Sequence, residues 1–283
     1  MRPEALDKTR RFREKAQARG VPSPAVEKWL ESARPCATLS TGTRGPVVGR
    51  LGGPALLPAD APVLPPRTYL IASLDLGALP EDATTMHLPR DGSLLLFARS
   101  YEYGLEAGGE AVYVPAGTPV EERRLDSGYA ADDPWSGLES RLAEAGELRL
   151  SHDLSLPDNE VLFDPAEHPH AGNLRAAWAD VAYEDRPLRG KGHLQLDGYS
   201  WDPYGEADVL TGAAEIAARQ AGEPPTTPAD PWEEPRPEHF ALLAQWYGEA
   251  HVDGQVYWTA ARADLSAHRI DRTSVHGFFE GPM

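Results

Sequence analysis

Apolar and polar positions follow the same order in both halves of the chain. In the first half, an apolar run at 69–76 is followed by a break, an Asp-Gly pair and a second apolar run at 94–97. In the second half, an apolar run at 240–247 precedes another Asp-Gly pair and an aromatic-rich run at 255–260. Apolar runs of this length between turn residues predict buried strands. The repeated order indicates one pseudo-symmetric body rather than two unrelated domains.

The strand assignment at 240–247 has a helical alternative. Phe240, Leu243 and Tyr247 also fall on one face of a helix. The correspondence of this run with the one at 69–76 favours a strand. Shorter strands are expected at 111–114, 193–196 and 270–279.

Apolar positions at helical spacing predict helices around these strands. The predicted helical segments are 4–19, 23–33, 136–146, 174–181 and 209–222. The first has a thin apolar face, so we expect a surface helix or a partly ordered arm. In the second, Ser23 followed by Pro24 predicts a capping serine with proline at the first helical position. In the third, Ser136 and Glu139 form a capping box and Gly146 can end the helix.

These elements predict an α+β fold with mostly antiparallel sheets and peripheral helices. A chain of 283 residues can bury a substantial core without disulfide bonds. We expect an N-terminal helical extension over 1–35 and one two-lobed domain over 36–283, built from a duplicated β-rich motif. The approximate halves of this domain are 36–150 and 151–283. The proline-rich stretch 224–237 is expected to be an extended connection.

Charge is distributed unevenly along the chain. The formal net charge is −17, but residues 1–20 hold seven basic and three acidic side chains, so the remainder carries −21. An acidic body repels nucleic acid phosphates and anionic membranes, so we expect neither as a partner. The basic N-terminal segment could be an interaction arm, but the reading that it folds back onto its own acidic body is favoured.

Cysteine content and apolar segments suggest the compartment. Cys36 is the single cysteine, so the chain has no intramolecular disulfide framework. The N-terminal segment lacks the apolar core of a secretion signal, and no apolar run reaches the length of a membrane span. We therefore expect a cytoplasmic protein.

Several short motifs, taken in their order along the chain, resemble the YwqG-like family of proteins of unknown function. They are Gly-Gly-Pro-x-Leu-Leu-Pro at 52–58, the run 70–80, Asp91-Gly92-Ser93-Leu94, Gly192-His193 with Gly198-Tyr199, the run 242–245, Val256-Tyr257-Trp258 and Asp264-Leu265. The resemblance covers about 48–279. It implies a single α+β body built from a duplicated β-rich motif. It brings no settled reaction and no agreed catalytic residues, so none are carried over.

The chain departs from the usual pattern of this family at three places. Members usually carry Gln where this chain has Ser73, whereas Gln245 keeps the equivalent position in the second half. Gly198-Tyr199 is followed by Ser-Trp-Asp-Pro rather than by Pro and then Gln. The Trp-Gly-Asp-x-Gly stretch before the last aromatic strand is reduced to Val-Asp-Gly at 252–254. These departures identify the chain as a diverged relative whose ligand site can be altered.

Residues that could support catalysis or bind metal do not form a competent set. His168 and His170 lie near Asp164 and Glu167, but no third ligand has a diagnostic spacing, so a solvated polar loop is favoured over a metal site. Cys36 has no Cys-His signature around it and is expected to be inert. The chain shows neither a nucleophile elbow nor a dinucleotide or phosphate-binding loop. We therefore expect no catalytic residue, no metal and no cofactor.

Candidate binding residues cluster after the strand predicted at 193–196. The candidates are His193, Asp197, Tyr199, Trp201, Asp202 and Tyr204. Trp and Tyr combine apolar area with a polar end and are favoured at binding sites. The alternative is that these rings pack in the core of the second β-motif and that His193 is satisfied by backbone at a strand edge.

Two classes of function remain open on this evidence. The first is a non-catalytic binding or interaction protein, for example a toxin-neutralising or regulatory partner whose acidic surface pairs with a basic protein. The second is an enzyme or small-ligand protein with a site between the two halves, using His193, Asp197, Tyr199 and Asp202. The first is favoured because no catalytic constellation can be assembled.

Overall fold

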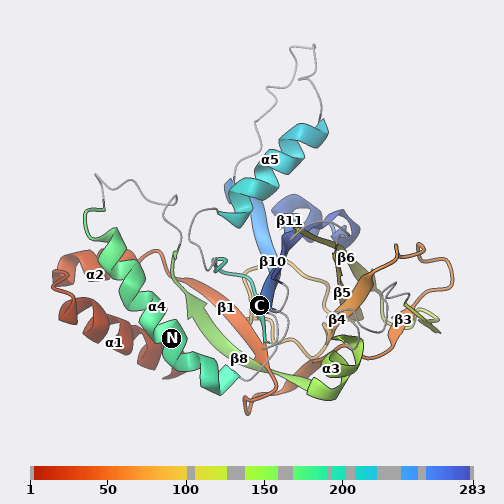
Figure 1. The fold of residues 1–283 in the computed structure, drawn as a ribbon, viewed down its shortest axis with the longest axis horizontal. Coiled ribbons are helices and arrows are strands. Elements are labelled where there is room, and N and C mark those ends of the chain that lie inside the picture. The colour runs from red at the N-terminus through yellow and green to blue at the C-terminus, as the bar shows by residue number, and fades with distance from the viewer. Residues whose placement is uncertain are drawn as a thin grey trace.

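The computed structural model describes residues 3–100, 106–125, 138–158, 168–189, 193–201, 208–221, 237–247 and 253–280. Their central feature is one antiparallel sheet that closes on itself as a barrel (Figure 1). The α+β class, the mostly antiparallel pairing and the peripheral helices are therefore confirmed. Within these ranges, no helix has both the length and the apolar character needed to cross a membrane.

Each strand of the barrel pairs with its two neighbours. The order around the barrel is β1 (Arg34–Ser40), β8 (Glu147–Ser155), β2 (Val47–Leu51), β4 (Thr68–Asp75), β5 (Ser93–Ser100), β6 (Glu106–Val114), β12 (Ser274–Glu280), β11 (Asp253–Ala261), β10 (Phe240–Tyr247) and β9 (Leu194–Leu196), which pairs back with β1. Strands β9 to β12 form one continuous arc, so the second half of the chain meets the rest of the barrel at two junctions, β6 with β12 and β9 with β1. A separate small sheet pairs β3 (Ala55–Leu57) with β7 (Glu121–Arg123).

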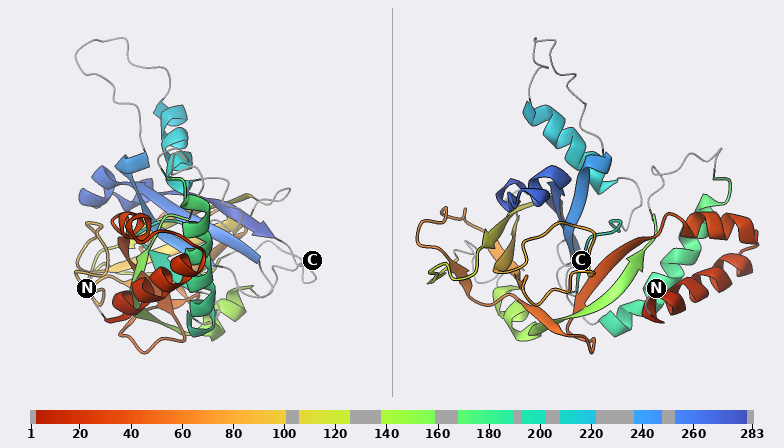
Figure 2. Two further views of the ribbon diagram at one scale, coloured as in Figure 1. Left: turned by 90° about the vertical axis from the view of Figure 1, so that its left-hand side faces the viewer. Right: turned by 180° about the vertical axis from the view of Figure 1, so that it is seen from behind.

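The helices lie outside the barrel (Figures 1 and 2). Helices α1 (Pro3–Ala18), α2 (Ser23–Leu30) and α4 (Ala171–Arg189) pack together beside β1 and β8. The others are α3 (Leu138–Ala145), α5 (Val209–Ala221), α6 (Arg262–Ser266) and the 3-10 turns η2 (Pro237–His239) and η3 (Ile270–Arg272). Helix α5 packs on the outer face of β10 and β11 through Val209, Leu210 and Ala213.

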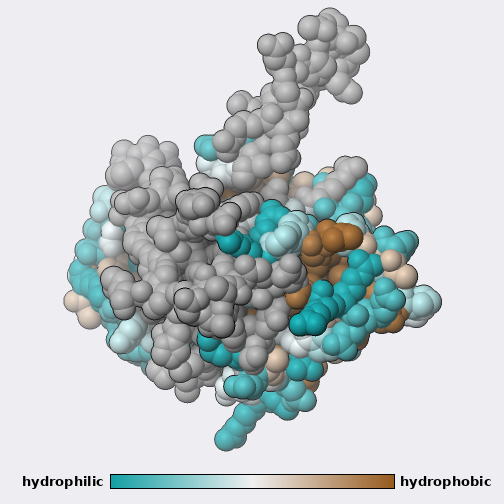
Figure 3. All heavy atoms as spheres, turned by 45° about the vertical axis from the view of Figure 1, so that its right-hand side comes forward, coloured by the Kyte–Doolittle hydropathy of each residue, from teal (hydrophilic) through white to brown (hydrophobic). Residues whose placement is uncertain are grey.

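The two largest of the four hydrophobic clusters among the described residues hold these layers together. The first fills the barrel and contains Trp246 and Trp258, both fully buried. The indole of Trp258 donates hydrogen bonds to the carbonyl oxygens of Phe97 (3.1 Å) and Glu110 (3.2 Å), which joins the second half of the chain to β5 and β6. The second core lies between the helical layer and the end of β8. Most of the surface in Figure 3 that belongs to described residues is hydrophilic, with an apolar patch on its right-hand side.

The N-terminal helix is a packed element. Phe12 and Ala16 are fully buried in the second core, so the thin apolar face seen in the sequence is enough to dock α1. The expected serine cap of α2 is wrong. Ser23 already lies in the first turn, the capping position belongs to Pro22, and no side chain caps this end. The helix also ends at Leu30 rather than near residue 33.

Most of the other predicted elements are found at their places. The run at 240–247 is strand β10, so the helical alternative is wrong. The strand expected at 270–279 starts later, at Ser274, because a 3-10 turn occupies Ile270–Arg272. Gly146 follows α3 with a φ of 88°, as expected for a glycine that ends a helix. The capping box of α3 and most of the stretch 224–237 lie outside the described residues.

The β4–β5 and β10–β11 hairpins share an irregularity. Pairing between β4 and β5 shifts by one residue between Leu70 and Ala72, and pairing between β10 and β11 shifts between Leu242 and Ala244. In both cases the shift follows the third residue of the first strand. An extra residue of this kind bends a strand and increases its twist, so both hairpins curve at the same point.

A second shared feature is the turn after β2 and β9. Gly52 and Gly53 follow β2 with φ values of 53° and 89°. Asp197 and Gly198 follow β9 with φ values of 64° and 82°. Each pair is a left-handed turn, a conformation that glycine adopts at little cost and that aspartate tolerates better than most residues.

Candidate ligand-binding site

The segment 197–201 continues the path of β9 and is held by buried polar side chains. The amide of Gln245 donates from Nε2 to the carbonyl oxygen of Trp201 (2.6 Å) and accepts at Oε1 from the Trp201 N–H (2.9 Å). The Tyr257 hydroxyl also donates to the Trp201 carbonyl (2.9 Å). Gln255 Oε1 accepts from Gln245 Nε2 (3.2 Å) and shares the single proton of the Tyr257 hydroxyl with the Trp201 carbonyl. Because a side-chain amide carries both donors and an acceptor, Gln245 satisfies the Trp201 backbone as a neighbouring strand would.

The start of the same segment is fixed from the other side. Gln195 Nε2 donates to the carbonyl oxygens of Asp197 (2.9 Å) and Tyr199 (2.7 Å). The Tyr199 N–H donates to Ser155 Oγ (2.8 Å). Gly198 must be glycine here, because a Cβ would lie 2.2 Å from Ser155 Oγ and 3.0 Å from the Cβ of Cys36. These bonds give the segment a single backbone conformation.

The carboxylate of Asp197 fastens the turn to the loop that follows β4. Its Oδ2 accepts from the Thr85 N–H (2.5 Å) and the Thr85 hydroxyl (2.6 Å), and its Oδ1 accepts from the Gly198 N–H (2.7 Å). The residue is 2% exposed. The structure therefore engages both oxygens of this predicted binding residue in internal hydrogen bonds.

Three aromatic rings meet at the end of β10. The His193 ring stacks on Tyr247 with centroids 4.2 Å apart and an interplanar angle of 19°. The Trp201 ring lies 5.5 Å from Tyr247 at 39°. The structure thus brings two of the predicted residues, His193 and Trp201, together through Tyr247. The sequence offered no separate signal for Tyr247, which lies at the end of a strand that was expected to be core.

A fourth predicted residue, Tyr199, joins the site to the helical layer. Its hydroxyl donates to the carbonyl oxygen of Ser32 (3.0 Å). The guanidinium of Arg34 lies over its ring, 4.1 Å from the centroid. The remaining candidates, Asp202 and Tyr204, lie outside the described residues.

A small cavity of about 50 Å³ lies where these side chains converge. Its walls include five ring systems, Trp178, His193, Tyr199, Trp201 and Tyr247. They come from α4, from the segment around β9 and from the end of β10. Since one water takes about 10–15 Å³ on the same measure, the cavity has room for about four waters or a small end group.

Lys8 of α1 also lines this cavity, and its charge is compensated. The side chain is buried, and Nζ donates to both carboxylate oxygens of Asp153 (2.7 and 2.9 Å). A second carboxylate, Asp185, lies 3.7 Å away. Nζ also lies over the Trp178 ring, 4.8 Å from its centroid. A buried ammonium held in this way is costly to move, so Lys8 is a fixed part of the wall.

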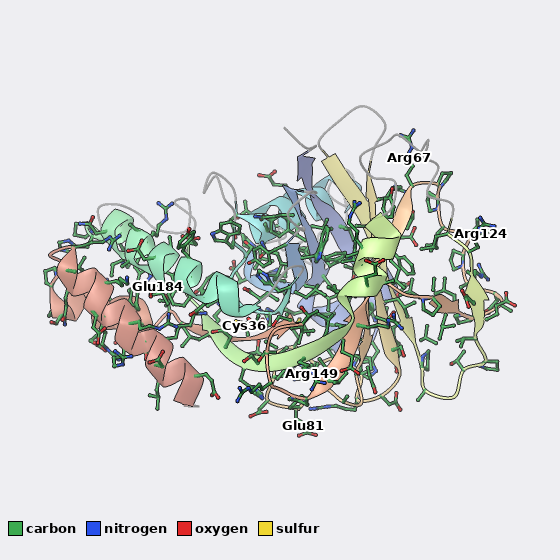
Figure 4. All side chains as sticks on the ribbon, turned by 60° about the horizontal axis from the view of Figure 1, so that its bottom comes forward. Cys36, Arg67, Glu81, Arg124, Arg149 and Glu184 are labelled. Carbon is green, nitrogen blue, oxygen red and sulfur yellow. The ribbon has the colours of Figure 1, made fainter. Side chains whose placement is uncertain are left out.

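Three further basic side chains of α1 pair with acids on α4. Arg19 contacts Asp180 (2.6 Å), Arg11 contacts Asp185 (2.7 Å), and Lys15 contacts Glu184. Figure 4 labels Glu184 on α4, on the side that faces α1. The hydrogen bond from Lys15 lowers the pKa of Glu184 below its ordinary value, against a smaller opposing effect of desolvation. The prediction that the basic segment folds back onto its own acidic body is confirmed.

The metal-like histidines lie in a different region. His168 contacts the Trp29 ring edge-on, with centroids 6.1 Å apart. Among the described residues, no group of three or more His, Cys, Asp or Glu side chains could hold a metal ion. Asp164 and Glu167 fall outside those residues. Cys36 is buried in β1 (Figure 4). It lines a separate cavity.

The arrangement suits recognition by ring faces. Asp197, Gln195 and Lys8 already make hydrogen bonds that hold the protein together, and five rings contribute to the cavity wall. No family model and no curated protein sequence matches this chain.

Proposed function

We propose that this is a non-catalytic binding protein whose site is the aromatic pocket, defined by Trp178, His193, Tyr199, Trp201 and Tyr247. The observation that carries the proposal is the convergence of rings from α4, β9 and β10 on one cavity. Rings supply large contact areas at a low entropic cost, and binding pockets are typically lined by them with a few fixed polar groups.

The buried polar side chains that hold the backbone of the pocket support the same proposal. Gln195, Gln245 and Tyr257 are buried and hold the backbone that carries Tyr199 and Trp201. Such a backbone loses little freedom when a ligand arrives, and pre-organisation of this kind is a recognised source of affinity. The small cavity suits the end group of a larger ligand rather than a whole metabolite.

The position of the pocket agrees with an origin by duplication, which we propose as part of this account. In this view β2, β4 and β5 correspond to β9, β10 and β11. The shared one-residue shift in the two hairpins supports the correspondence. So do the left-handed pairs at 52–53 and 197–198. The pocket then lies beside the β9–β1 junction between the halves of a two-lobed, YwqG-like body.

Native mass spectrometry of the protein from its own host tests this proposal. The wild type should carry a discrete mass increment, and Trp201→Ala should lose it because the ring forms part of the cavity wall. The hydrogen bonds to the backbone of residue 201 are kept in this variant, so its fold should persist. Tyr183→Ala serves as the control, since Tyr183 is exposed on α4 and does not line the cavity. An increment that survives in Trp201→Ala places the ligand elsewhere and contradicts the proposal.

A second candidate function is docking of a basic protein partner. The observation that favours it is the internal neutralisation of α1, whose cations pair with Asp180, Glu184 and Asp185. With the α1 cations paired internally, the net charge of −17 that the whole chain carries is available to an external cation. A toxin-neutralising or regulatory role belongs to this class. Capture of a basic protein at low salt that is released at high salt supports it, and capture unaffected by salt contradicts it.

A further inference from the structure

We infer that the group recognised in the aromatic pocket is a cation, an ammonium or a guanidinium. This inference rests on the proposed binding function and adds the chemical class of the ligand. The faces of Trp and Tyr rings carry negative potential, so a cation over such a face is attracted, and the attraction grows when water is excluded.

The protein uses its own rings in this way beside the pocket. Lys8 Nζ lies 4.8 Å from the centroid of Trp178, and the Arg34 guanidinium lies 4.1 Å from that of Tyr199. An ammonium and a guanidinium are thus both accommodated on ring faces within one cluster. Trp201 and Tyr247 belong to the same cavity wall, with ring centroids 5.5 Å apart, so the cavity offers two further rings to a group that enters.

The charges beside the pocket offset one another, and the charge of the whole chain favours a cation. Lys8, the ammonium in the wall, is bonded to Asp153 and lies 3.7 Å from Asp185, so two carboxylates face it. Arg11 shares Asp185, which leaves this group of four side chains balanced, and the guanidinium of Arg34 over Tyr199 adds one positive charge. Asp158 also lines the cavity. The chain as a whole carries −17, and a field of this sign raises the local concentration of cations.

The size of the cavity limits how the cation arrives. A space of about 50 Å³ admits a planar guanidinium or an ammonium but not the rest of a large ligand. Two sources share this chemistry, a free small amine or guanidine and the side chain of Arg or Lys in a basic polypeptide. The experiment below separates them.

The test compares methylguanidinium with methylurea, a neutral molecule of the same shape. Binding is followed by NMR on the indole N–H signal of Trp201, which is identified by its loss in Trp201→Leu. Methylguanidinium should shift this signal, and methylurea should bind about tenfold more weakly because it lacks the charge. Tyr247→Leu should weaken methylguanidinium binding about tenfold, whereas Tyr183→Leu, outside the cavity wall, should leave it unchanged.

Two further probes separate the sources of the cation. The tripeptide Gly-Arg-Gly is compared with Gly-citrulline-Gly, which again differs only in charge. Tighter binding of Gly-Arg-Gly than of methylguanidinium supports a polypeptide, and equal or weaker binding supports a free small cation. In either case the citrulline peptide should bind more weakly than the arginine peptide.

The outcomes distinguish this inference from the proposed function. Equal binding of methylguanidinium and methylurea overturns the inference that the ligand is a cation, but it leaves the proposed binding function of the pocket intact. If neither methylguanidinium nor methylurea binds but the mass increment depends on Trp201, the inference of a cation is again overturned and the binding function is retained. Failure of both probes with no such increment overturns the cation and the binding function together.

Discussion

The side chain of Gln245 holds the backbone of Trp201 with two hydrogen bonds, one donated and one accepted. Gln245 is fully buried in β10, and Trp201 lies beyond the end of β9, where pairing between those strands has stopped. The buried amide of Gln245 therefore replaces the backbone hydrogen bonds that a paired strand would give to the segment that forms the pocket.

Gln245→Ala should destabilise the protein by about 3 kcal/mol, because it removes both bonds to Trp201 and leaves buried polar groups behind. Urea unfolding gives the change in free energy. The matched control is Ser73→Ala, the sixth residue of β4 as Gln245 is the sixth of β10, which should cost less than about 1 kcal/mol because Ser73 is only partly buried. Equal losses in the two variants would argue against a special role for this amide.

Gly198→Ala should be more damaging than Gly117→Ala, although both glycines have a left-handed backbone. Their φ values are 82° and 78°. A Cβ at Gly117 meets nothing within 4 Å, so only the backbone cost of about 1–2 kcal/mol applies there. A Cβ at Gly198 collides with Ser155, so the loss measured by thermal or urea unfolding should be larger by about 1–3 kcal/mol. Similar losses at both sites would show that the turn relaxes.

Lys8→Met should cost about 3 kcal/mol, because it leaves the carboxylate of Asp153 partly buried without its ammonium. The comparison is Arg13→Met, which breaks the exposed ion pair with Glu27 and should cost less than about 1 kcal/mol. Unfolding monitored by tryptophan fluorescence is suitable, because Trp29 and Trp178 lie in the same core. A neutral or stabilised Lys8→Met would mean that Asp153 takes up a proton or water at little cost.

Docking of α1 should weaken in acid. The pKa of Glu184 is lowered by its hydrogen bond from Lys15, and that of Glu27 is lowered by its hydrogen bond from Arg13. Because these values are lowered in the folded state, the stabilisation is complete above the ordinary glutamate pKa of 4.5 and is lost as the pH falls through the lowered values.

The test is urea unfolding of the wild type and Glu184→Gln between pH 7 and pH 3. The variant lacks the titrating group, so the difference between the two proteins should shrink as the pH falls below 4.5. A difference that stays constant over this range would show that Lys15 contributes nothing to the docking of α1.

The strands with long apolar runs could be recognised from local pattern alone. The runs at 69–76, 94–97, 240–247 and 255–260 all form strands, because burial on both faces demands continuous apolar side chains. Strands β1 and β8 were not expected. The stretch 147–155 does alternate Leu148 and Leu150 with polar residues, a strand pattern that could have revealed β8, whereas the mixed sequence of β1 offers little.

The candidate site was predictable only in part. His193, Tyr199 and Trp201 stand close together in sequence, and their residue types suggested binding. Lys8, Trp178 and Tyr247 reach the same cavity from far along the chain. The reason is physical. Periodicity and turn chemistry act over a few residues and so can be read locally. Which strands become neighbours, and which rings meet at their ends, depends on closing the barrel and satisfying every buried polar group at once, as Gln245 does for Trp201.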